Sequence, residues 1–373
     1  MYTISISAPS YKGIYTVKFS SNGKYIVSGG NETGINLWDI KSGRLLKKLH
    51  KGITINSVSM SRDGKYILSG GEDGSLHVWD IVSGECIQSH SEELYSNIDD
   101  IEILFDDDTV VYSHGVNLSF IQLSKNKKIH TIDIRNISDE RYQECTYISV
   151  YNKYITFGHK ENVFLCSLDG TVLQKFVGHN GNVVSTKIAS DGLIIASSSA
   201  DKSIILWDAV NGDIIHQLYG HKEVITSIVF SKDEKYLIST SKDQTIRLWD
   251  CTTGEQKHIF KMEKEYKGIY DIDISPNGKY LISGGGDGIV KLWDIESGEI
   301  LIHFIDKGYG EWISYCEKEP GVEYYNCSEN SRKDVFFYNN IMSIFNDEPS
   351  LCDKDNKIYT ERYTNILLDK FEY

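Results

Sequence analysis

The sequence lacks long apolar runs and paired cysteines. No stretch approaches the roughly 18 consecutive apolar residues that cross a bilayer, and Met1 to Ser10 hold no basic segment followed by an apolar one. The seven cysteines are scattered and never spaced as Cys-x-x-Cys, so neither a disulfide framework nor a zinc motif is indicated. We therefore expect a cytoplasmic protein without a membrane span.

Clusters of basic residues are also missing. The chain holds 39 basic and 53 acidic residues, a formal net charge of −14, so neither nucleic acid nor an anionic membrane is expected as a partner. One acidic stretch runs from Asp99 to Asp108 around an expected strand and turn. We interpret it as a polar loop, with a surface for a basic partner as the alternative.

The sequence does contain an internal repeat. Five Trp-Asp pairs begin at Trp38, Trp79, Trp207, Trp249 and Trp293, with spacings of 41, 128, 42 and 44 residues. Because the gap of 128 residues is about three periods, two units without the dipeptide are expected inside it. Ile121 and Cys166 occupy the tryptophan position of these two units.

Hairpin turns count the repeats independently. A small polar pair that indicates a turn lies upstream of each Trp-Asp position. Several of these pairs are Asn-Gly or Asp-Gly, which favour tight hairpins because both residues can adopt positive φ. Turns begin at or near Asn22, Asp63, Asp107, Asn152, Asp191, Asp233, Asn277 and Pro320. These eight turns predict eight units.

Each unit has the pattern of a four-stranded meander. Residues 269–274, 279–283, 289–293 and 299–304 show it most clearly, with a glycine turn between the last two strands. A sheet that is apolar on both faces is unstable alone, and radial stacking of copies hides most strand edges. We therefore predict an all-β fold, a single β-propeller of eight four-stranded blades, with seven blades as the alternative.

The repeats resemble the WD40 family over residues 1 to about 340. His179, Ser197, Asp201 and Trp207 stand where that family places a structural hydrogen-bond network, and His221, Ser239, Asp243 and Trp249 repeat the arrangement. The resemblance implies a buried chain of hydrogen bonds from Asp through His and Ser to the indole, which is architecture rather than chemistry. Parts of the network are expected at Trp38, Asp73, Trp79, Asp287 and Trp293.

The two chain ends are expected to close the ring together. Propellers of this family commonly share one blade between their ends, and residues 2–7 have the pattern of an outer strand that completes the last blade. That blade is expected around the turn at Pro320, with Trp312 in its core. The predicted propeller domain is 1–340.

The tail, 341–373, has a different pattern. Tyr359, Tyr363, Ile366, Leu367 and Phe371 form the apolar stripe of an amphipathic helix at about 358–371. We expect the helix to pack on the propeller, and binding of a partner by this helix is the alternative.

Residues 310–328 resemble a segment near the end of bacterial WD40 proteins, some of which are associated with caspase-like proteases. The resemblance implies a caspase-like protease as a partner, in a signalling or defence complex.

Motifs for catalysis and cofactors are not found. There is no Gly-x-x-x-x-Gly-Lys loop, Gly-x-Ser-x-Gly elbow or His-Glu-x-x-His sequence. His114 and His159 occupy equivalent places in neighbouring units, and two imidazoles without a third ligand are interpreted as a coincidental pair. We expect no catalytic residue, no cofactor and no metal site.

Fold analogy favours a scaffold or regulatory adaptor that binds one or more proteins through the propeller rim. The candidate partner-binding residues, taken by position, are Tyr11, Thr54, Glu72, Asn182, Lys222, Lys242 and Tyr266. The alternative is a ligand-binding, hydrolase or lyase propeller, which requires ionisable groups that converge on the central channel.

Overall fold

The structure, a computed structural model, describes residues 13–50, 52–92, 96–137, 147–261, 268–308, 311–318 and 322–328. These residues form seven antiparallel sheets, which we number blades 1 to 7 in chain order, and one short 3-10 helix, η1 (Ile134–Asn136). Strands of β-branched and aromatic residues suit such sheets because both faces of a blade are packed. No helix of these residues is long and apolar enough to cross a membrane.

Six blades contain four consecutive strands each, and blade 7 contains six. Blades 1 to 3 contain β1 (Ile14–Phe19), β2 (Tyr25–Gly30), β3 (Gly34–Asp39), β4 (Leu45–Leu49), β5 (Ile55–Met60), β6 (Tyr66–Gly71), β7 (Ser75–Asp80), β8 (Cys86–Ser91), β9 (Ile98–Ile103), β10 (Thr109–His114), β11 (Asn117–Gln122) and β12 (Lys127–Asp133). Blades 4 to 6 contain β13 (Ile148–Tyr151), β14 (Tyr154–His159), β15 (Asn162–Ser167), β16 (Val172–Val177), β17 (Val183–Ile188), β18 (Ile194–Ser199), β19 (Ser203–Asp208), β20 (Ile214–Tyr219), β21 (Ile225–Phe230), β22 (Tyr236–Ser241), β23 (Thr245–Asp250) and β24 (Gln256–Lys261). Blade 7 contains β25 (Ile269–Ile274), β26 (Tyr280–Gly285), β27 (Ile289–Asp294), β28 (Ile300–Gly308), β29 (Glu311–Lys318) and β30 (Val322–Cys327).

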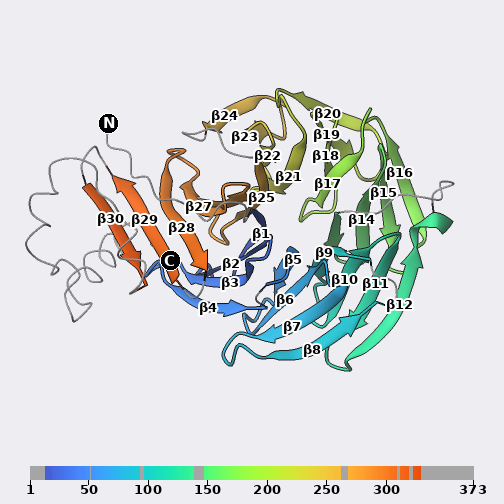
Figure 1. Cartoon of the computed structure of the whole chain (residues 1–373). Helices are drawn as coiled ribbons and strands as arrows, with labels where there is room; N and C mark the ends of the chain where they lie inside the picture. Colours follow the sequence, from blue (N-terminus) through green and yellow to red (C-terminus); the bar gives the residue numbers. More distant parts are fainter. Residues whose placement is uncertain are drawn as a thin grey trace, which may run out of the picture.

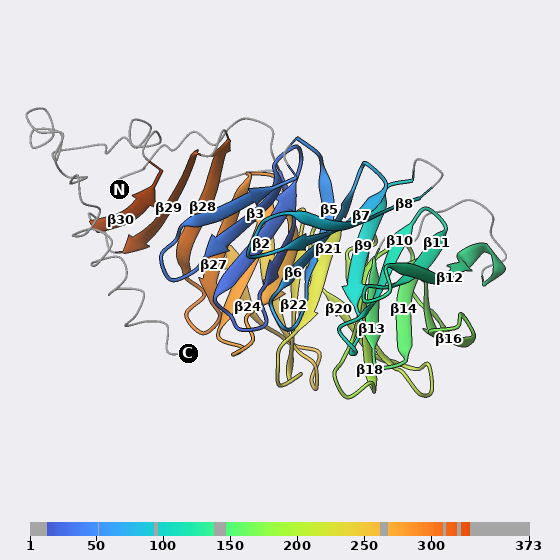
Figure 2. The ribbon, with the colours of Figure 1, turned by 90° about the horizontal axis from the view of Figure 1, so that it is seen from below.

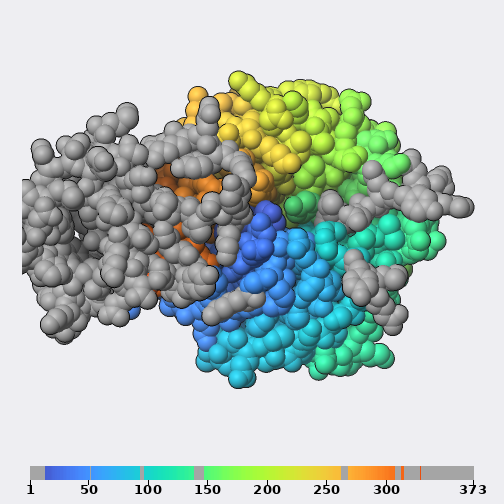
Figure 3. Space-filling model, in the orientation of Figure 1, coloured from blue at the N-terminus to red at the C-terminus, as the bar shows by residue number. Residues whose placement is uncertain are grey.

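The first strand of every blade lies at the axis of the ring (Figure 1). Each of these inner strands packs against the inner strand of the next blade, and β25 of blade 7 packs against β1 of blade 1. Figure 3 shows this junction on one face, where blue atoms of blade 1 meet orange atoms of blade 7. The described residues therefore form a closed ring of seven blades, the alternative in the sequence prediction.

The prediction of an eighth blade is corrected by the place of residues 311–327. Their strands β29 and β30 do not reach the axis but extend the outer edge of blade 7, where β29 pairs with β28 (Figures 1 and 2). An eighth inner strand has no place because β1 already packs on β25. Trp312 lies in a core, as expected, but in the one that blades 1 and 7 share.

Seven apolar clusters hold the ring together, one between each pair of adjacent blades. Each cluster contains the second and third strands of one blade and the inner strand of the next. The tryptophan of a repeat therefore lies in an interface between blades: Trp207 packs against blade 4, and Trp249 packs against blade 5. Stacking of two-sided sheets is thus the main source of stability.

Glycine permits close approach between adjacent inner layers. A Cβ on Gly70 of β6 would lie 2.3 Å from Cγ2 of Ile98 in the next blade, and a Cβ on Gly284 of β26 would lie 2.5 Å from Cγ2 of Ile14. Both distances are far shorter than a van der Waals contact. Close packing of an isoleucine against a glycine is therefore found both between consecutive blades and at the junction that closes the ring.

Several predicted features lie outside the described residues. They are the strand at 2–7, Tyr11, Tyr266, the turn at Pro320 and the helix at about 358–371. Blade 7 has a fourth strand of its own in β28, so residues 2–7 are not needed to complete its four-stranded core.

Candidate functional site

The hydrogen-bond network expected from the family resemblance lies inside blades 5 and 6. In blade 5 the Trp207 indole donates to Ser197 Oγ at 2.8 Å, His179 Nε2 lies 2.8 Å from the same hydroxyl, and His179 Nδ1 lies 3.0 Å from Asp201 Oδ2. In blade 6 Trp249 donates to Ser239 at 2.8 Å, and His221 joins Ser239 at 2.8 Å to Asp243 at 2.9 Å. Every polar atom of these chains has a partner, which is what a buried network requires.

The network shifts the pKa values of its members. Burial lowers the pKa of both His179 and His221, although their aspartates oppose the effect. Burial alone would raise the pKa of Asp243, but hydrogen bonds from His221, Thr245 and the Lys222 amide hold it well below its usual range. Neutral imidazoles and ionised carboxylates are therefore the stable states near neutral pH.

Three other blades keep part of the network. The indoles of Trp38, Trp79 and Trp293 donate to Ser28, Ser69 and Ser283 at 3.2, 2.9 and 2.9 Å, respectively. Asp287 of blade 7 pairs with Lys291, and Asp73 of blade 2 is hydrogen bonded to His77. The tryptophan-to-serine contact is thus common to five blades, whereas the partner of the aspartate changes.

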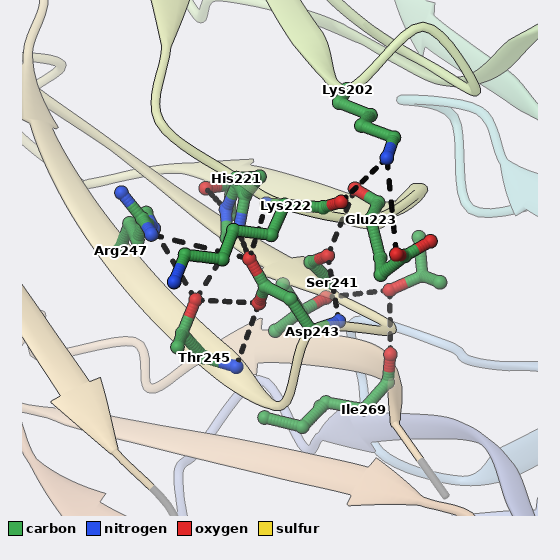
Figure 4. Close-up of polar contacts among 12 residues, drawn as sticks. Lys202, His221, Lys222, Glu223, Ser241, Asp243, Thr245, Arg247 and Ile269 are labelled. Carbon is green, nitrogen blue, oxygen red and sulfur yellow. Dashed lines mark hydrogen bonds and ion pairs between the residues drawn. The ribbon is translucent and has the colours of Figure 1, made fainter.

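The network also fixes the loops on one rim of the ring, as Figure 4 shows for blade 6. The Lys222 amide donates to Asp243 Oδ2 at 2.8 Å, and Ser241 Oγ donates to the Glu223 carbonyl at 3.1 Å. In blade 5 the Asn180 amide and the Gly181 carbonyl are held in the same way by Asp201 and Ser199, at 2.8 Å each. These loops connect an outer strand to the next inner strand. Their backbone is held in place by the hydrogen bonds to the networks of the two blades.

The candidate rim residues differ in exposure. Glu72, Asn182, Lys222 and Lys242 are exposed. Thr54 is only 5% exposed, and its hydroxyl donates to Asn31 Oδ1 at 3.3 Å, so its side chain does not contribute to an open surface.

Charged residues line the central channel, a feature that sequence reasoning missed. Two equivalent positions of the inner strands carry acidic residues, Asp100 and Glu102 in β9 and Asp271 and Asp273 in β25. The second position is lysine in two other blades, Lys18 in β1 and Lys187 in β17. Lys187 Nζ lies 3.1 Å from Glu102 Oε1, an ion pair that joins blade 5 to blade 3, the two blades on either side of blade 4. The acidic stretch at 99–108 is therefore only partly a polar loop.

Two of these carboxylates each link three blades through hydrogen bonds. Asp100 Oδ1 accepts from the Ser57 hydroxyl of blade 2 at 2.9 Å, and its Oδ2 accepts from the Ile148 amide of blade 4 at 3.0 Å. Asp271 likewise accepts from Ser227 of blade 6 at 2.8 Å and from the Val17 amide of blade 1 at 3.0 Å. The signal that would have found them is the period-2 position of an acidic residue in an inner strand.

Burial and neighbouring charges shift the pKa values of the acidic and basic residues in the channel. Burial raises the pKa of Asp100 to about 6, and the neighbouring Glu102 adds to the rise. Burial alone would lower the pKa of Lys18, but Asp273 and Asp271 hold it above its usual range. Ionisable groups do converge on the channel, yet Asp100 and Asp271 are engaged in holding blades together.

Among the described residues, three potential metal ligands gather in one place, His50, Asp73 and His77. Of the two histidines that the sequence places in equivalent positions, His114 has hydroxyl partners at both ring nitrogens. These nitrogens lie 3.3 Å from Ser96 Oγ and 2.8 Å from Ser119 Oγ. A group of side chains able to bind a metal ion therefore lies between blades 1 and 2, and the spacing of its residues in the sequence matches no regular ligand motif.

Comparison with protein families matches the blades just described. The model for "WD domain, G-beta repeat" matches residues 3–39, 43–80, 170–208, 212–250 and 254–294, which together exceed half of the chain. The comparison with curated proteins returns no match. The unmatched interval between residues 80 and 170 covers blade 3 and the first three strands of blade 4, and both blades lack the tryptophan but have the four-stranded sheet. With five matched repeats inside one closed seven-bladed ring, the chain belongs to the WD40 family.

Proposed function

We propose that this propeller is a non-catalytic scaffold that binds a partner protein on the rim above blades 5 and 6. The observation that carries the proposal is a set of exposed polar side chains on loops with a fixed backbone. We call this surface the blade 5–6 rim, and it consists of Asn180, Asn182, Lys202, Lys222, Glu223 and Lys242.

Preorganisation makes this rim a better binding surface than an ordinary loop. The amides and carbonyls of residues 180, 181, 222 and 223 are tied to the buried networks of the two blades. A partner therefore does not bear the entropy of ordering these loops on binding.

Charge indicates the kind of partner. The rim carries three lysines and one glutamate in a chain whose net charge is −14. Lys202 Nζ donates to the Lys222 carbonyl at 2.7 Å and lies 3.8 Å from Glu223 Oε1, while both side chains stay about half exposed, at 49% and 58% (Figure 4). An acidic segment of a partner protein fits this surface best.

A caspase-like protease in a bacterial cytoplasmic complex is the more specific form of the proposal. Its support is the resemblance of residues 310–328 to the end of bacterial WD40 proteins. A catalytic propeller remains the alternative because ionisable groups converge on the channel. The engagement of Asp100 and Asp271 in contacts between blades favours the scaffold.

The test compares two triple variants of the full chain in quantitative pull-downs from the source cells. One combines Lys202→Glu, Lys222→Glu and Lys242→Glu on the rim. The matched control combines Lys24→Glu, Lys65→Glu and Lys235→Glu, three exposed lysines in turns on the opposite face. We expect proteins enriched by the wild type and the control to be lost from the rim variant. Equal enrichment by all three proteins, or specific enrichment by none, would contradict the proposal.

A further inference from the structure

A cluster of two histidines and one aspartate lies where blade 1 meets blade 2. His50 directly follows the outer strand β4, Asp73 lies in the turn between β6 and β7, and His77 lies in β7. His77 Nε2 is 2.8 Å from Asp73 Oδ2, His50 Nε2 is 3.7 Å from the same oxygen, and the two imidazole centroids are 4.4 Å apart. One potential ligand atom from each residue lies within 4.8 Å of the other two.

Blades 5 and 6 show how a structural histidine is satisfied, and His50 differs from them. In those blades the imidazole has partners at both ring nitrogens, a serine hydroxyl and an aspartate. Among the described residues, the buried Nδ1 atom of His50 has no hydrogen-bond partner, and the centroid of the His50 ring lies 5.2 Å from that of the Trp79 ring. Ordinary hydrogen bonding within this fold therefore does not account for the position of His50.

The position of His77 gives a second comparison. The equivalent residue is Arg247 in blade 6 and Lys291 in blade 7, and each of these cations pairs with the aspartate four residues before it. In blade 2 the aspartate meets two imidazoles rather than one fixed cation. A bound cation would supply the positive charge that the side chain provides in the other two blades.

The ligand types select the ion. Imidazole nitrogens with one carboxylate suit zinc and related transition metals, whereas magnesium and calcium prefer oxygen ligands alone. Such ligands must be deprotonated to bind a metal ion, and an imidazole of ordinary pKa, about 6.5, is mostly neutral at pH 7. The side chains of His50, Asp73 and His77 are 13%, 25% and 15% exposed, so an ion can reach them from solvent.

We propose that His50, Asp73 and His77 form a binding site for a divalent transition-metal ion of the zinc class, with the fourth position open to water. The ion joins the end of β4 in blade 1 to β7 in blade 2. Cys86 belongs to the surroundings of the site, because its Sγ lies 3.7 Å from the other ring nitrogen of His77.

The experiment titrates Zn²⁺ calorimetrically into the chelator-treated full chain. Wild type, Cys86→Ser and the matched control His258→Gln, an exposed histidine of blade 6, should each bind one ion. His50→Gln and His77→Gln should each weaken binding by more than about 100-fold, since loss of an outer-shell partner alone typically weakens it by about 10- to 100-fold.

Two results would overturn the site. One is the absence of stoichiometric binding by the wild type, and the other is wild-type affinity in both histidine variants. Loss of binding in Cys86→Ser alone would likewise overturn it by assigning the ion to a thiol. Circular dichroism without metal confirms that each variant is folded, and two separate histidine variants keep the test decisive if one fails.

Discussion

Blades 5–6 and blades 3–4 solve the same packing problem with opposite residue sizes. In blades 5 and 6 a large tryptophan on the third strand meets a small serine on the second, as Trp207 meets Ser197. In blades 3 and 4 the large residue is on the second strand and the small one on the third. Tyr112 and Phe157 occupy the serine position, and Ile121 and Cys166 occupy the tryptophan position.

This reciprocal exchange shows that volume, rather than the Trp-Asp dipeptide, defines a blade. Ile121 and Cys166 are fully buried, as are Tyr112 and Phe157. A core filled to native density tolerates exchanges that keep the total volume and the apolar pattern. The polar network adds a second layer of contacts in blades 5 and 6 and fixes the loops at residues 180–181 and 222–223.

The largest expected effect is at Trp249. It is 2% exposed and fills the interface between blades 5 and 6, so Trp249→Ala should lower the free energy of unfolding by about 3–5 kcal/mol. The equivalent change in blade 4, Cys166→Ala, should cost about 1 kcal/mol because little volume is removed. Chemical denaturation of both variants measures the difference, and equal losses would break the comparison.

The exchange itself can be tested in blade 4. Phe157→Ser should cost about 3–5 kcal/mol through the cavity that it leaves. Adding Cys166→Trp recreates the arrangement of blades 5 and 6, with an indole opposite a serine hydroxyl. We expect the double variant to recover at least about 1 kcal/mol relative to the sum of the single changes, measured as a double-mutant cycle. Strict additivity would show that the two positions do not share one packing volume.

The sequence predicted the repeated sheets well because both of their signals are local. Turn residues with positive φ, such as Gly64 and Gly278, mark the hairpins, and short alternating runs mark the strands. The WD40 resemblance was carried by the repeated tryptophans and by the His, Ser and Asp residues of the network, and the family match confirms it. These signals do not depend on which blade a strand joins.

The number of blades was not local information. Residues 311–327 have the strand pattern of an inner hairpin, but β29 pairs with β28 because the inner place beside β25 belongs to β1. The channel charges and the cluster of His50, Asp73 and His77 were missed for the same reason. Lys187 and Glu102, for example, meet only because the ring places blades 3 and 5 on either side of blade 4.

The contributions of blades 5 and 6 and of blade 3 to the pH dependence of stability should have opposite signs. His179 and His221 have pKa values below the usual 6.5, so as pH falls below 6.5 the unfolded chain takes up protons first and stability is lost. Asp100 in blade 3 has its pKa raised to about 6, so the native state takes up its proton first and stability rises as pH falls through 6.

Variants at these residues separate the two contributions to the pH dependence of stability. Between about pH 7 and pH 5, Asp100→Asn should lose stability more steeply than the wild type, and the pair His179→Gln with His221→Gln should lose it less steeply. Denaturation midpoints at a series of pH values provide the measurement. Parallel curves for all three proteins would mean that these groups do not determine the pH dependence.

The smallest expected effect concerns backbone strain at the blade 5–6 rim. Lys202 has φ of 73°, and the corresponding residue of blade 7 is Gly288, with φ of 73°. A side chain in the left-handed region costs about 1–2 kcal/mol, and part of the gain from glycine is offset by the greater entropy of the unfolded chain. Lys202→Gly should therefore raise the free energy of unfolding by less than about 1 kcal/mol, whereas Gly288→Lys should lower it by a similar or larger amount. Thermal or chemical denaturation measures both variants, and opposite signs of the two stability changes would show that blade 5 retains a strained residue where blade 7 has glycine. A loss of stability in Lys202→Gly would show that the contact of the Lys202 ammonium with the Lys222 carbonyl outweighs the strain.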